Sequence, residues 1–350
     1  MTTRLRATRP IAFTMLCACA LLVLAAATPI KPDLLAGLVW RNVGPFRGGR
    51  ISAVTGAIGE PGVYYAGTPA GGVWKTTSAG ETWYPVFDAI KDIASIGAVE
   101  VAPSNPNIVY AGAGDKVNGG GVNVGNGMYR SDDAGATWRH IGLGDSRVIP
   151  SLIVDPSNPD IVLAAAEGNL LAKSEMRGVY RSTDGGRTWT KTLYLDDSTG
   201  VQKMARAFDR PNVIFTTTIR HYNTPTPPSG IFPAPPTPPA GPRPAPATAT
   251  RLYKSTDEGL TWTEVTGGGL PRLNGCEYVA VAQNTDAQRV FVIGNNGLFR
   301  TDDGGTTWRQ MDKDDDRIRN GQGGYNCGVY VNTHNPDIVY TIHTSSYVST

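Results

Sequence analysis

An eight-residue pattern, Ser/Thr-x-Asp-x-Gly-x-Thr-Trp, recurs along this chain of 350 residues and restricts it to folds built from repeated units. Intact copies occupy residues 131–138, 182–189, 255–262 and 301–308, and residues 76–83 form a variant copy. In each copy the Asp and the first hydroxyl can accept hydrogen bonds from nearby backbone N–H groups, and the Gly permits the positive φ of a tight reversal. The pattern therefore predicts a series of β-hairpins.

The acids and tryptophans of these hairpins recur together, which bears on their role. A residue that a reaction needs once is not expected in every repeat. We therefore interpret the whole set as structural rather than catalytic or metal-binding: Asp133, Trp138, Asp184, Trp189, Asp257, Trp262, Asp303 and Trp308.

A second sequence pattern recurs between the hairpins, at residues 101–110, 154–162 and 331–340. It predicts a strand, an Asn-Pro turn and another strand. Each repeat is then a four-stranded antiparallel meander, and a period of about 50 residues with four strands is typical of a β-propeller. We predict an all-β propeller with about six blades. The last blade is either closed by residues 38–43, which resemble a fourth strand, or incomplete because the chain is a fragment; we favour the fragment.

The N-terminal and Pro-rich segments lie outside the repeat pattern. Residues 1–27 combine three Arg, an apolar run and three Ala before Thr28, which predicts a cleaved signal peptide rather than an uncleaved anchor. Residues 28–350 would then be an exported propeller without a membrane span, located in the periplasm, on the cell surface or outside the cell. Residues 223–250 are rich in Pro and are interpreted as a loop insertion.

Two cysteines, Cys276 and Cys327, remain after the predicted cleavage, and each precedes an apolar strand in consecutive repeats. In an oxidising compartment a disulfide between them is one interpretation, and two buried thiols are the other.

Antiparallel pairing places the hairpins and the turns between the first two strands on one face of the propeller. We call this the box face, and the opposite face, which receives the longer loops, the loop face. Binding residues concentrate on loops held by a rigid scaffold, so the loop face is the predicted ligand site. Its candidate residues are Arg47, Arg50, Asp145, Arg147, His221, Asp314 and Arg317.

The chain lacks sequence motifs for a cofactor, a nucleotide or a metal. The mature charge is close to neutral, which gives no indication of a nucleic-acid partner. No His spacing suits a metal and no Gly-x-Ser-x-Gly or Walker loop occurs, so we expect no cofactor and no metal.

The hairpin pattern resembles the Asp-boxes, or BNR repeats, of sialidases, sortilin-type VPS10 propellers, xyloglucan-cleaving endoglucanases and photosystem II assembly factors. With residues 40–45, 71–75 and 95–99, the chain most resembles the N-terminal part of large exported bacterial proteins described as sortilin-like or BNR-repeat glycosyl hydrolases.

The enzymatic relatives are matched only in part. Residues 46–49 lack the Ile-Pro of the sialidase Phe-Arg-Ile-Pro motif. Where the resemblance to xyloglucanases implies a catalytic Asp, this chain has Pro69, which removes one of two carboxyl groups.

These departures favour a non-catalytic propeller that binds a glycan or an extended peptide. One alternative is a glycoside hydrolase that uses loop-face carboxylates such as Asp88, Asp145, Asp196 or Asp197. A second alternative is an assembly or scaffold factor for a membrane complex.

Overall fold

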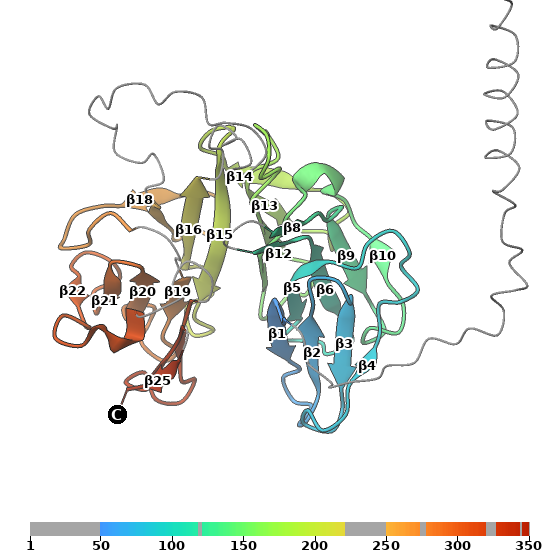
Figure 1. Cartoon of the computed structure of the whole chain (residues 1–350), viewed down its shortest axis with the longest axis horizontal. Coiled ribbons are helices and arrows are strands. Elements are labelled where there is room, and N and C mark those ends of the chain that lie inside the picture. The colour runs from blue at the N-terminus through green and yellow to red at the C-terminus, as the bar shows by residue number, and fades with distance from the viewer. Residues whose placement is uncertain are drawn as a thin grey trace, which may run out of the picture. The chain divides into compact units, whose positions relative to one another are not determined.

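The fold is that of a β-propeller with six antiparallel sheets as its blades and almost no helix, as the repeats predict (Figure 1). It is given by a computed structural model, which describes residues 50–117, 121–220, 250–273, 278–319, 327–343 and 345–349. The predicted signal peptide, residues 38–43, the Pro-rich insertion, Arg47, His221 and Cys276 lie outside the described residues.

The first three sheets have four strands each. The first contains β1 (Ala53–Gly56), β2 (Tyr64–Gly67), β3 (Val73–Thr76) and β4 (Tyr84–Pro85). The second contains β5 (Ile96–Val101), β6 (Val109–Ala113), β9 (Met128–Ser131) and β10 (Arg139–His140). The third contains β11 (Ser151–Val154), β12 (Val162–Ala166), β13 (Gly178–Ser182) and β14 (Thr190–Leu193).

The fourth and fifth sheets repeat this plan, and the sixth has three described strands. The fourth contains β15 (Thr199–Arg206), β16 (Ile214–Arg220), β17 (Leu252–Ser255) and β18 (Thr263–Val265). The fifth contains β19 (Tyr278–Val281), β20 (Val290–Gly294), β21 (Gly297–Thr301) and β22 (Arg309–Gln310). The sixth contains β23 (Gly328–Val331), β24 (Val339–Ile342) and β25 (Ser346–Val348).

A small hairpin and two 3-10 helices lie in loops of the described residues. Strands β7 (Asp115–Val117) and β8 (Gly121–Asn123) form the hairpin between β6 and β9, and the helices η2 (Gly144–Ser146) and η3 (Asp316–Arg319) follow the second and fifth sheets. The sequence predicts longer loops on the loop face, and it does not identify the β7–β8 hairpin.

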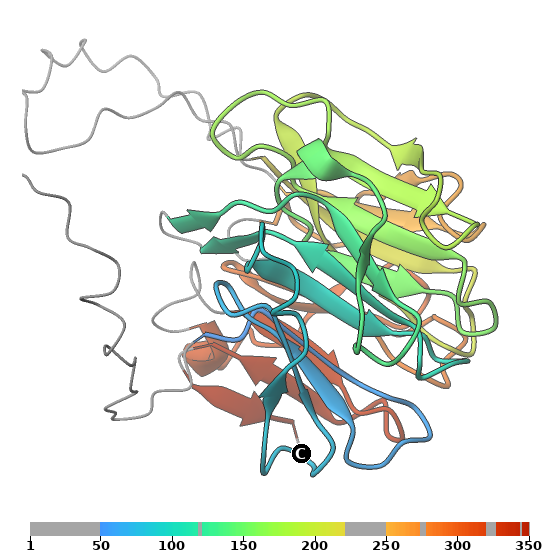
Figure 2. The same ribbon diagram turned by 90° about the vertical axis from the view of Figure 1, so that its right-hand side faces the viewer.

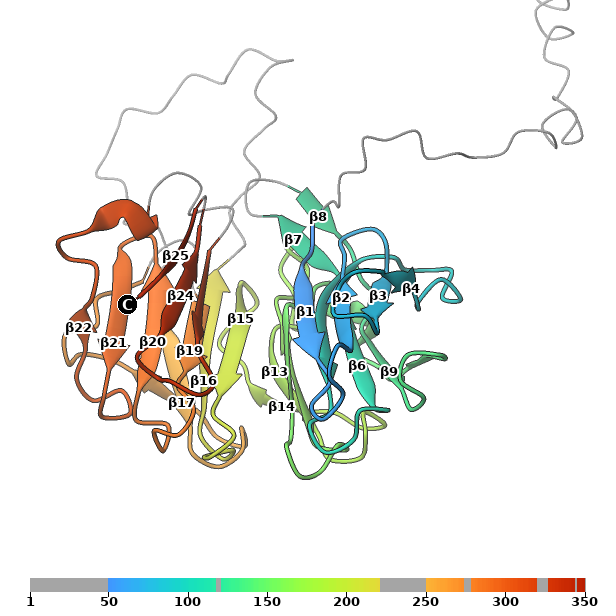
Figure 3. The same cartoon turned by 90° about the horizontal axis from the view of Figure 1, so that it is seen from below.

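Within each sheet the strands follow one another outward in chain order, from β1 to β4 and from β19 to β22 in Figure 3. Each Asp-box lies beside the turn between the first two strands of its own sheet, because its backbone bonds to that turn. The Ala134 N–H donates to Asn107 O (2.8 Å), and the Gly185 N–H donates to Asp160 O (2.9 Å). Both kinds of turn therefore occupy the box face.

The core is divided into five apolar clusters, each formed where two consecutive sheets pack face to face. The ribbons of the second and third sheets lie side by side in Figure 2. Between them, Tyr110 and Met128 pack with Leu152, Val162 and Ala164. This burial of apolar surface holds the blades together. Cys327 is buried in the cluster between the fifth and sixth sheets, and its pairing with Cys276 stays a prediction.

Among the described residues, no helix is both long and apolar enough to cross a membrane.

Candidate functional site

The Asp-box carboxylates bond within their own hairpins. Asp257 accepts hydrogen bonds from Ser255 Oγ (2.8 Å), from the Thr261 backbone N–H (2.9 Å) and from Thr261 Oγ1 (2.6 Å). These bonds favour the ionised form, and they hold the pKa of Asp257 at about 2, below its usual range. The same three bonds recur at Asp133, Asp184 and Asp303.

The box tryptophans join neighbouring sheets. Trp138 Nε1 donates to Val86 O (2.8 Å), which follows the outer strand of the preceding sheet. Trp189 Nε1 donates to Ile141 O (2.7 Å) and Trp262 Nε1 to Thr192 Oγ1 (3.2 Å). Trp308 Nε1 donates to Gly305 O within its own hairpin (3.1 Å). The first three indoles therefore link their hairpins to the preceding blade.

The five described loop-face residues that were predicted to bind a ligand are not brought into one site. Arg50 forms an ion pair with Asp115. Arg317 pairs with Asp315, with Nε 2.8 Å from Oδ1. Asp145, Arg147 and Asp314 are exposed. None of the five described candidates lines the three cavities discussed below, so their binding role stays a prediction.

Charged side chains do gather at the loop-face edge of the third and fourth sheets, around Arg251. The Arg251 guanidinium lies 3.5 Å from Glu264 Oε2 on β18. A hydrogen bond with Tyr253 is the main cause that raises the pKa of Arg251, and Glu264 and Asp196, on the loop after β14, add smaller electrostatic contributions. Glu264 is thus paired with Arg251, and Asp196 lies within electrostatic range of the same guanidinium.

The loop that carries Asp196 is fixed by its own hydrogen bonds. Asp196 Oδ1 accepts the Ser198 backbone N–H (2.7 Å). The adjacent Asp197 pairs with Lys173 (3.0 Å), and hydrogen bonds from Lys173 and Ser198 lower its pKa. Asp197 is therefore held ionised.

Arg177 is fully buried beneath this loop. Its guanidinium donates to the backbone oxygens of Asp197 (2.8 Å), Asn169 (2.5 Å) and Ala172 (3.0 Å). Buried donors that bond to carbonyls in this way fix a loop in place. The Asp196–Asp197 segment is consequently pre-organised rather than free to move.

A cavity of about 450 Å³ opens beside Arg251 and Glu264 on the loop face. It is lined by the start of β17, the end of β18 and the following loop to Leu273. A cavity of this size with a few convergent polar groups is typical of a small-molecule or saccharide subsite. Among the described residues, no group of three or more His, Cys, Asp or Glu could hold a metal ion.

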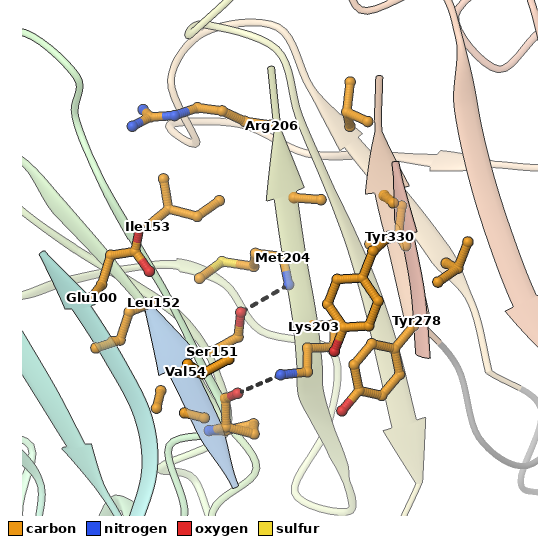
Figure 4. Close-up of a pocket in the computed structure, with 18 of the residues that line it drawn as sticks. Val54, Glu100, Ser151, Leu152, Ile153, Lys203, Met204, Arg206, Tyr278 and Tyr330 are labelled. Atoms are coloured by element: carbon orange, nitrogen blue, oxygen red, sulfur yellow. Dashed lines mark hydrogen bonds between the residues drawn. The ribbon is translucent and has the colours of Figure 1, made fainter. Parts of the chain in front are cut away.

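A second cavity, of about 380 Å³, follows the centre of the propeller and is lined by the innermost strands of all six sheets (Figure 4). Lys203 on β15 donates to Pro150 O (3.1 Å) and lies over the Tyr278 ring (4.8 Å to its centroid). Ser151 Oγ accepts the Met204 backbone N–H (3.1 Å), which joins the third and fourth sheets.

Glu100 on β5 is the carboxyl group of this central cavity (Figure 4). Burial raises its pKa to about 7, although Arg206, Lys203 and a hydrogen bond to Thr55 lower it. Glu100 is therefore partly protonated near neutral pH. No sequence pattern singled it out, because it occupies an ordinary alternating position in a strand.

Residues 180–191 match the BNR/Asp-box repeat family model. A xyloglucanase of a Paenibacillus species is 30% identical over 259 residues, covering 69% of this chain and 23% of that protein. A xyloglucanase of Hypocrea jecorina is 35% identical over 189 residues, covering 49% of this chain and 20% of that protein. The chain thus spans about a quarter or less of these relatives.

Solved structures confirm the fold. The Niastella koreensis GH74 enzyme matches with a TM-score of 0.60 and 19% identity, over 85% of this chain and 44% of that one. An ancestral GH74 enzyme matches with a TM-score of 0.57 and 18% identity, over 87% and 36%.

These relatives correct the functional expectation. The expectation of a non-catalytic binding module, which rests on Pro69 at the place of a xyloglucanase acid, is wrong, because the relatives that match this chain are named xyloglucanases. The described residues form a six-bladed β-propeller of the BNR/Asp-box repeat kind.

Proposed function

We propose that this chain is a propeller of a glycoside hydrolase that cleaves a xyloglucan-like polysaccharide on the loop face. The similarity to xyloglucanases of Paenibacillus and Hypocrea jecorina carries the proposal. The ligand is then a glycan, and residues 1–27 act as an export signal for the propeller of residues 28–350. Export would place the enzyme where such polysaccharides occur.

Hydrolysis of a glycosidic bond uses two carboxyl groups, one to protonate the leaving oxygen and one to activate water or attack the sugar. We assign this pair to Asp196 and Glu264, because both interact with Arg251 and because Glu264 lines the loop-face cavity. Arg177 orders the Asp196–Asp197 loop, so the pair would be held in place before substrate arrives. Asp196 and Glu264 would then supply both carboxyl groups, although position 69 carries Pro instead of an acid.

The experiment is a reducing-sugar assay on xyloglucan, with the wild-type protein beside Asp196→Asn and Glu264→Gln. Removing either carboxyl group is expected to lower kcat by on the order of 100-fold or more. Asp88→Asn and Asp145→Asn are matched controls, because these acids occupy the equivalent loops of the first and second blades, and they should retain activity. Hydrolysis that survives both test substitutions, or a wild-type protein inactive on xyloglucan, contradicts the proposal.

A further inference from the structure

A third cavity, of about 690 Å³, lies at the box-face end of the central cavity, on the side opposite to the proposed catalytic pair. It is lined by turns between the first two strands of five sheets, the third sheet being the exception. Glu100 and Phe208 line both this cavity and the central one. We call this third cavity the mouth.

The mouth combines an aromatic platform with hydrogen-bonding groups. Phe208 is 47% exposed, so about half of its surface is open to solvent. Gln283 lies next to it, because Gln283 Oε1 accepts the Phe208 backbone N–H (2.7 Å). Asn284 and His334 add further polar side chains to the wall.

The charges around the mouth select against an anionic ligand, because Asp209 and Glu100 are carboxyl groups in its wall. Arg206 and Lys203 interact electrostatically with Glu100 from the central cavity and partly offset its charge. An apolar ring surrounded by amides and carboxyl groups suits a neutral molecule with several hydroxyl groups and one less polar face.

We propose that the mouth binds a neutral sugar residue, which stacks on Phe208 and hydrogen-bonds to Asp209 and Glu100. This is a second saccharide site, on the opposite face from the proposed catalytic pair and independent of it. A polysaccharide held there would keep the enzyme on its substrate between cleavage events. The site therefore contributes to binding and not to the chemical step.

The test compares three monosaccharides that differ in charge, namely glucose, glucosamine and glucuronate, by NMR titration of the full chain. Glucose is expected to bind more tightly than glucuronate, whose charge the carboxyl groups of the wall oppose, and glucosamine shows how far a positive charge changes the affinity. Phe208→Ala should weaken glucose binding by about fivefold or more, and Asp209→Asn by about threefold. Glu100→Ala should weaken it similarly, whereas Glu100→Gln, which keeps a donor and an acceptor, should retain most of the affinity.

Ser157→Ala is the matched control, since Ser157 is exposed in the equivalent turn of the third sheet, which does not line the mouth. Glucuronate binding as tight as glucose binding, glucosamine binding at least tenfold tighter than glucose binding, or glucose binding unchanged by Phe208→Ala, overturns the proposal. Glu264→Gln separates this site from the catalytic one. The variant should lose hydrolysis and keep glucose binding at the mouth, so each proposal can fail without the other.

Discussion

Two carboxylates on one hairpin of the fourth sheet have opposite surroundings. Asp257, at the box-face end, accepts three hydrogen bonds from its own hairpin. Glu264, seven positions later on β18, lines a cavity and lies 3.5 Å from the Arg251 guanidinium. A carboxylate whose acceptor sites are filled locally stabilises a fold, whereas one that faces a cavity remains available to a ligand.

The box of the first blade has Ser78 in place of the Asp. Ser78 Oγ still accepts the Thr82 backbone N–H (2.9 Å) and bonds to Thr82 Oγ1 (3.0 Å). A neutral hydroxyl thus reproduces the geometry of the box without its charge. The box requires an acceptor at this position, and the carboxylate strengthens the bonds.

Acidification would remove the stabilising charge from all four intact boxes together. It is therefore expected to have the largest effect on the free energy of unfolding. The folded-state pKa of Asp184 and of Asp257 is about 2, below an unfolded value of about 4. Stability from these groups is therefore complete above pH ~4 and is lost as pH falls toward ~2. Urea unfolding at steps between pH 5 and pH 2 measures this, and a flat profile would contradict it.

Removal of one box acid is expected to lower the stability of the protein by a smaller amount. Asp257→Ala is expected to lower the free energy of unfolding by about 1–2 kcal/mol, because the Thr261 N–H and both hydroxyls lose their acceptor. Denaturant midpoints provide the measurement. Thr256→Ala is the control, since Thr256 is exposed in the same hairpin; an equal loss in both variants would count against the role of the acid.

An acid introduced into the first box is expected to change the stability of the protein least. Ser78→Asp is expected to stabilise the protein by about 0.5 kcal/mol, because charge-assisted hydrogen bonds are stronger than neutral ones but the hairpin is exposed. Thermal melts at pH 7 and pH 2 test this. The gain should appear at pH 7 and be largely lost at pH 2, and an equal gain at both would point to another cause.

The fold could be predicted from the sequence because each hairpin is encoded locally, within eight residues that repeat. The candidate sites could not, because they form where separate strands meet. Glu264 and Glu100 occupy ordinary polar positions in β18 and β5. Folding brings Arg251 next to Glu264 and Arg206 within electrostatic range of Glu100. Asp196 was recognised as a loop-face acid, but its relation to Arg251 depends on the packing of two blades.

The measurement that tests the account most directly is made on Asp257→Asn and Glu264→Gln, two amide substitutions in one hairpin. Xyloglucan hydrolysis and urea unfolding are measured on both proteins. The account predicts that Asp257→Asn loses stability and keeps its kcat, and that Glu264→Gln keeps its stability and loses hydrolysis. Loss of kcat in folded Asp257→Asn, or full hydrolysis by Glu264→Gln, would contradict it.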